Sequence, residues 1–146
     1  MPYRLMLILV SEGQEGNLGE DWKYELGVKV FSDGLKSEKT VEVPKHRLES
    51  GTIQQPHGVT EPLLLCEGEP GEELLLRFHL VATEVDLFIN DVGSVSRDLQ
   101  IQLPRPGDPV LSREVDLSAG VRESPGIRDL NSVFTLRVRL VIEKAE

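Results

Sequence analysis

Apolar and polar residues alternate along the carboxyl-terminal part of the chain, and this two-residue period constrains the fold more than any other feature. Between residues 133 and 142 the apolar positions of one set are Phe134, Leu136, Val138, Leu140 and Ile142. Threonine and arginine residues stand among the positions between them. Because consecutive side chains of a β-strand point to opposite faces, the pattern predicts a strand with one buried face and one solvent-facing side. Leu136, Val138 and Leu140 are therefore expected to point into a core.

Similar segments recur along the chain, separated by clusters of Gly, Pro, Asp and Ser that are typical of turns. Eight strands are expected in all, at residues 5–10, 23–30, 40–43, 61–66, 74–80, 98–103, 110–117 and 133–142. No window has a helical apolar stripe longer than two turns. A chain of 146 residues is about one domain. The sequence thus predicts an all-β fold, an antiparallel eight-stranded β-sandwich that spans residues 1–146 as a single domain.

Charge and composition narrow the class of function. The net charge is −9, from 25 acidic and 16 basic residues, so the chain repels phosphate backbones and no nucleic-acid partner is expected. The apolar run at residues 5–10 is too short for a secretory signal or a membrane span, which predicts a cytoplasmic protein with no transmembrane segment. Cys66 is the one cysteine and follows three leucines, so a buried, inert thiol is expected.

No local signature of an enzyme is present in the sequence. His46, His57 and His79 have no metal-binding or catalytic spacing, and no glycine-rich loop opens a helix. His46 and His57 are interpreted as ordinary loop histidines, and His79 as a partly exposed strand residue. The chain is therefore predicted not to be an enzyme.

Oxygen ligands gather in residues 81–94, where a long apolar strand runs into Glu84, Asp86, Asn90 and Asp91. Calcium prefers six to eight oxygen ligands, and carboxylates two residues apart in an extended segment point to the same side. A second acidic and glycine-rich loop is expected at residues 11–21, and another long loop at residues 45–59. Two interpretations are open: a metal site, or acidic residues gathered in solvated turns.

Aromatic and apolar residues beside these loops carry their own predictions. Trp22 begins a strand directly after the first acidic loop and is expected to be a core anchor. Phe88 and Ile89 lie in the middle of the other acidic loop. They are expected to tuck back against the protein, and a tip that inserts into a membrane is the alternative.

The two acidic segments together resemble the C2 domain, a family of calcium- and lipid-binding β-sandwiches. Residues 15–30 resemble the first binding loop of that family, with an acidic residue, an Asp six positions later and then an aromatic-led strand. Residues 76–93 look like its third loop, with paired acids, Asn-Asp and a following Gly. The resemblance implies a calcium site whose ligands are Glu15, Asp21, Glu84, Asp86 and Asp91. It departs from the family in having Glu at positions 15 and 84, where Asp is typical.

These observations lead to one preferred function, one structural alternative and a third interpretation, an enzyme whose active-site residues are dispersed along the chain. The chain is predicted to be a non-catalytic C2-like docking module, which binds calcium or meets a lipid surface or a protein through loops at one end. Members of the family that have lost metal binding serve as protein-docking modules, and the resemblance covers that case too. The alternative is a structural β-sandwich subunit of a larger assembly, which self-associates through an open sheet edge or face and binds no ligand. The oligomeric state stays open.

Overall fold

A computed structural model describes residues 2–59, 61–110, 112–123 and 130–145. These residues form nine β-strands and no helix. The strands are β1 (Tyr3–Gly16), β2 (Asp21–Phe31), β3 (Leu35–Arg47), β4 (Ile53–Gln54), β5 (Leu63–Gly68), β6 (Glu73–Glu84), β7 (Asp91–Gln102), β8 (Ser112–Arg122) and β9 (Asn131–Lys144). Within the described part of the chain, no helix is long and apolar enough to cross a membrane.

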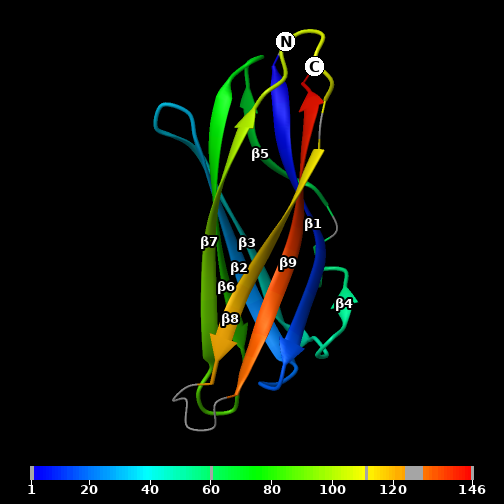
Figure 1. Ribbon diagram of the computed structural model, residues 1–146, viewed down its shortest axis with the longest axis vertical. Coiled ribbons are helices and arrows are strands. Elements are labelled where there is room, and N and C mark those ends of the chain that lie inside the picture. The colour runs from blue at the N-terminus through cyan, green and yellow to red at the C-terminus, as the bar shows by residue number, and fades with distance from the viewer. Residues whose placement is uncertain (1, 60, 111, 124–129, 146) are drawn as a thin grey trace.

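The strands form two sheets that pack face to face (Figure 1). The first sheet has the order β4-β1-β9-β8, and β5 pairs with the same edge of β1 as β4 does. The second sheet has the order β3-β2-β6-β7, and all pairings between named strands are antiparallel. The predicted all-β antiparallel sandwich is confirmed. The expected number of eight strands was too low by one, because the two-residue strand β4 forms inside the segment that was expected to be a loop.

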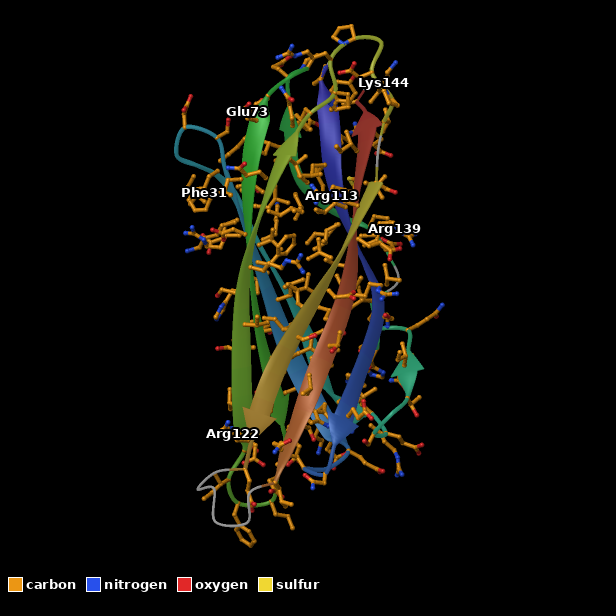
Figure 2. The ribbon with its side chains drawn as sticks, in the orientation of Figure 1. Phe31, Glu73, Arg113, Arg122, Arg139 and Lys144 are labelled. Carbon is orange, nitrogen blue, oxygen red and sulfur yellow. The ribbon has the colours of Figure 1, made fainter. Side chains whose placement is uncertain are left out.

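The alternating residues point as their period predicts, and they fill the space between the sheets (Figure 2). Leu136 and Val138 are fully buried and Leu140 is 1% exposed. Trp22 is also fully buried, so its predicted role as a core anchor is confirmed. Its ring stacks on Phe134, with 5.7 Å between the ring centroids, and its indole N–H donates to the carbonyl oxygen of Gly19 at 3.0 Å. Trp22 therefore joins the β1–β2 connection to the core.

The strands are longer than the apolar runs that predicted them, most clearly in β1. Its ladder with β9 continues to Gly16, which pairs with Ser132, so residues 11–16 belong to the sheet. The acidic loop expected at residues 11–21 is reduced to residues 17–20. The register shifts between Leu9 and Ser11, as at a β-bulge, and the shift turns the even-numbered Glu12 and Gln14 toward the interior.

The two connections with acidic residues lie at the same end of the sandwich. In Figure 1 the β1–β2 and β6–β7 connections are both at the lower end, whereas the two chain termini are at the upper end. Gly93 in β7 allows a close approach near the lower end, since a Cβ atom there would stand 2.2 Å from the carbonyl oxygen of Gly120 in β8. Backbone contact at this point brings the edge of the second sheet against the first.

Candidate metal centre

The hairpin of β6 and β7 positions the acidic residues that the sequence singled out. Glu84 is the last residue of β6 and Asp91 the first of β7, and the two are directly paired across the ladder. Residues 85–90 connect them. The backbone N–H of Val85 donates to the carbonyl oxygen of Asp21 at 2.7 Å, which ties the start of this connection to β2. Glu84 and Asp91 therefore stand on strand ends, and Asp86 lies in the short connection between them.

Three carboxylates meet at this position. Each of Glu84, Asp86 and Asp91 has a carboxylate oxygen within 4.8 Å of such an oxygen in the other two, and we call these residues the acidic cluster. Glu84 and Asp91 are 3% and 1% exposed, whereas Asp86 is open to solvent. Among the described residues, this is the one group of three or more His, Cys, Asp or Glu side chains close enough to bind a metal ion.

Hydrogen bonds within residues 85–90 hold Asp86 in its place. The Asp86 backbone N–H donates to Oδ1 of Asn90 at 3.0 Å, and Oδ1 of Asp86 accepts from the backbone N–H of Leu87 at 3.1 Å. Side chains that bond to nearby backbone groups fix the conformation of a short turn. One oxygen of Asp86 is therefore engaged within the turn, and Asn90 acts as a support for the turn.

The ionised form of the Glu84 side chain is destabilised by its surroundings. Burial, followed by the negative charge of Asp86 and a side-chain hydrogen bond with Asp91, raises the pKa of Glu84 to about 7, and the charges of Asp91 and Asp21 add to the effect. Its Oε1 atom is buried and has no hydrogen-bond partner. Its Oε2 atom lies against Gly19, where a Cβ atom would come within 3.1 Å of it. A buried carboxylate oxygen without a donor is costly, and a cation in the cluster would remove that cost.

The structure brings together some of the five predicted ligands. Glu84, Asp86 and Asp91 form the acidic cluster, and Asp21 is close enough for its charge to act on Glu84. Asp21 is the exposed first residue of β2 and is not a member of the cluster itself. Glu15 lies on the other sheet, where it pairs with Val133 of β9 and is exposed to solvent. The first connection therefore contributes a nearby charge to the cluster, and Glu15 stands apart from it.

Three consecutive apolar side chains project from the β6–β7 connection beside the acidic cluster. Leu87, Phe88 and Ile89, which we call the tip, are 90%, 94% and 51% exposed. The expectation that Phe88 and Ile89 tuck back was wrong. The turn closed by Asp86 and Asn90 is too short to fold its own middle residues onto the sandwich, so it directs them outward.

A second group of polar residues, buried between β1 and β3, was missed by reasoning from the sequence. Glu12 is fully buried, and its carboxylate accepts hydrogen bonds from the Tyr24 hydroxyl at 2.8 Å and from Gln54 Nε2 at 2.9 Å. His46 also contacts it. His46 was interpreted as a loop histidine, but it lies in β3 with its side chain only 5% exposed. The two-residue alternation could not predict this arrangement, because the register shift in β1 reverses which of residues 11–16 point inward.

Comparisons with known proteins found no match for this chain among protein-family models or among curated proteins. The observed architecture, two antiparallel sheets in an all-β sandwich, is compatible with a C2-like fold.

The raised pKa of Glu84 predicts how pH changes the stability of the metal-free protein. The folded state holds this proton up to about pH 7, whereas an ordinary glutamate releases it near 4.5. The contribution to stability is therefore full below about pH 4.5 and is lost as the pH rises through 7. Glu84→Gln should remove this loss, so the variant should be more stable than the wild type at pH 8, in denaturant titrations with chelator present.

Glu20→Gln is a matched control, because Glu20 is an acid at the same end whose carboxylate pairs with Arg47 at 2.7 Å. It should keep the wild-type pH dependence. If the stability of Glu84→Gln follows the wild-type curve from pH 5 to pH 8, ionisation of Glu84 does not destabilise the folded protein.

Proposed function

We propose that this chain is a non-catalytic, C2-like docking module that binds calcium in the acidic cluster and then contacts an anionic lipid surface through the tip. The observation that carries the proposal is the buried, unpartnered Oε1 atom of Glu84, in a group of three converging carboxylates. A folded protein keeps such an arrangement at a cost in stability. Carboxylates that repel one another without a cation, and are stabilised by one, support a role in cation binding.

Calcium is the cation that suits this donor set. The cluster offers only carboxylate oxygens, which hard cations prefer, and it contains neither the imidazole nor the thiolate ligands typical of zinc sites. Calcium also accepts irregular geometry and bidentate carboxylates, whereas magnesium demands a near-octahedral arrangement. Three carboxylates leave coordination positions for water or for the phosphate oxygens of a lipid.

The position of the tip supports a lipid surface as the partner. Leu87 and Phe88 are almost fully exposed, and exposed apolar groups of this size are costly in water unless another surface covers them. The protein has a net charge of −9, which opposes contact with anionic headgroups. A divalent cation bound beside the tip reverses the sign of the charge where contact is made, so calcium and the tip would act together.

Vesicle sedimentation tests this function. The wild type should sediment with vesicles that contain phosphatidylserine when calcium is present, and should stay in the supernatant when chelator replaces calcium. Phe88→Ser should lose most of the sedimentation because it removes a large apolar side chain from the contact. The same variant should still be stabilised by calcium in a thermal melt, since Phe88 supplies no oxygen ligand.

Leu35→Ser is the matched control, since Leu35 is 56% exposed at the start of β3, toward the other end of the sandwich (Figure 1). It should sediment like the wild type. If the wild type fails to sediment in calcium although calcium stabilises it, the tip meets a protein and not a lipid surface. If calcium neither stabilises the wild type nor makes it sediment with vesicles, the chain is better explained as a protein-docking module without metal or as a structural subunit.

A further inference from the structure

We propose that Glu12 and His46 share one proton and form a pH-sensitive latch, which holds residues 48–57 along the side of β1, where the side chains of Glu12 in β1 and His46 in β3 are in contact. This segment leaves β3, carries the short strand β4 and lies along the side of β1 (Figure 1). The latch is separate from the acidic cluster in both its residues and its chemistry.

The Glu12 carboxylate receives hydrogen bonds from three other parts of the chain. Its Oε1 atom accepts from the Tyr24 hydroxyl of β2 at 2.8 Å and from the backbone N–H of His57 at 3.1 Å. Its Oε2 atom accepts from Gln54 Nε2 of β4 at 2.9 Å and contacts Nε2 of His46. Glu12 is fully buried, so these contacts replace its hydration. One side chain thus joins β1 to β2, β3 and the segment that carries β4.

The hydrogen bonds of His46 require a proton in its contact with Glu12. Its Nδ1 atom lies 2.9 Å from the carbonyl oxygen of Pro44, which can only accept, so Nδ1 carries a hydrogen. A neutral imidazole with its hydrogen on Nδ1 has a lone pair on Nε2. A carboxylate oxygen also has only lone pairs, so the close contact of Nε2 with Oε2 of Glu12 needs one further proton between them. Because neutral donors already satisfy the carboxylate, the structure assigns this proton to the imidazole.

The groups around the pair keep the proton in place. The His57 ring stacks on the His46 ring, with 4.7 Å between the centroids and 9° between the planes, and covers it from solvent. Two stacked imidazolium cations would repel, so the arrangement suits one charged ring and one neutral ring. Burial, followed by the charge of Glu12, raises the pKa of Tyr24 far above its usual value, so Tyr24 stays a neutral donor. The next residue on β3, Arg47, has its charge engaged by Glu20 and Glu49.

Loss of the shared proton would loosen the segment, because the segment covers the Glu12 carboxylate. Without this proton, lone pairs face each other across the contact, and the buried carboxylate has no counter-charge. The segment keeps ties that do not involve this proton, such as the bonds from the Leu48 N–H to the Glu20 carbonyl oxygen at 2.7 Å and from the Gly51 N–H to the Gln14 carbonyl oxygen at 2.8 Å, so it stays attached to the sandwich while it opens more often. The ladders of the sandwich do not depend on this proton. The latch is therefore closed at acidic pH and opens as the pH rises.

Amide hydrogen exchange, expressed as protection factors so that the intrinsic pH effect is removed, tests the latch. Between about pH 5 and pH 8, the range in which histidines change charge, protection of the Gly51 and His57 amides should fall about tenfold, as expected for one charge-assisted hydrogen bond. Amides of the central ladders, such as Leu80, should keep their protection. Glu12→Gln should abolish the pH dependence, because an amide can donate to the neutral imidazole without an added proton.

Two further variants keep the test decisive. His46→Gln also removes the titrating group and should give the same flat profile if Glu12→Gln fails to fold. His79→Gln is the matched control, since His79 lies on the outer face of β6 and its Nδ1 atom bonds the Ser96 hydroxyl, and it should keep the wild-type profile. A wild-type profile that is flat, or one that keeps its slope in both Glu12→Gln and His46→Gln, would overturn the proposal.

Discussion

Replacement of Val138 with aspartate should unfold the domain. Val138 lies in β9, is fully buried, and pairs with Leu9 on one side and with Val115 on the other. Aspartate at this position would bury a charge with no donor to bond it, at a cost of several kcal/mol. Because the whole stability of a domain is about 5–15 kcal/mol, a loss of this size should remove cooperative unfolding. Circular dichroism during a thermal or urea titration measures the result.

Val133→Asp is the matched control, since it makes the same chemical change in the same strand at an outward-facing position that is 47% exposed. It places a charge opposite Glu15 across the ladder, a pairing that should cost less than about 1 kcal/mol. Equal tolerance of the two substitutions would mean that β9 does not have the register described here.

The fold could be predicted because its strands have one buried face. In β9 the two-residue period identifies the inward residues directly, and the structure confirms them. The period fails in β1, where the register shift between Leu9 and Ser11 turns Glu12 and Gln14 inward. No local property of the sequence marks that shift. The extension of β1 to Gly16 is likewise a result of pairing with β9, since residues 11–16 are too polar to indicate a core strand.

The candidate site could be predicted only for those residues that are close to one another in the sequence. Glu84, Asp86 and Asp91 are close in sequence, so a single hairpin brings them together. The position of Glu15 depends on how the two sheets pack, which spacing cannot show. The exposure of Phe88 was also missed, because the hydrogen bonds that close the turn below it depend on side-chain geometry.

Calcium should stabilise the fold strongly, because it neutralises carboxylates that repel one another in the metal-free protein. A cation present at about 100 times its dissociation constant adds about 2.7 kcal/mol to the free energy of unfolding. For a domain of this size that is a rise of several degrees in melting temperature. Asp86→Asn and Glu84→Gln should lose the response, while their metal-free forms should be no less stable than the wild type. Removing one charge from the acidic cluster relieves its repulsion.

Thermal melts of the wild type, Asp86→Asn and the control Asp33→Asn, each with millimolar calcium and with chelator, decide whether the acidic cluster binds calcium. Asp33 lies in the turn between β2 and β3, away from the acidic cluster, and its φ of +50° is one that asparagine tolerates. Calcium should raise the melting temperature of the wild type and of Asp33→Asn by several degrees, chelator should reverse the rise, and Asp86→Asn should not respond. A wild-type melting temperature that is the same in calcium and in chelator would mean that the acidic cluster binds no calcium.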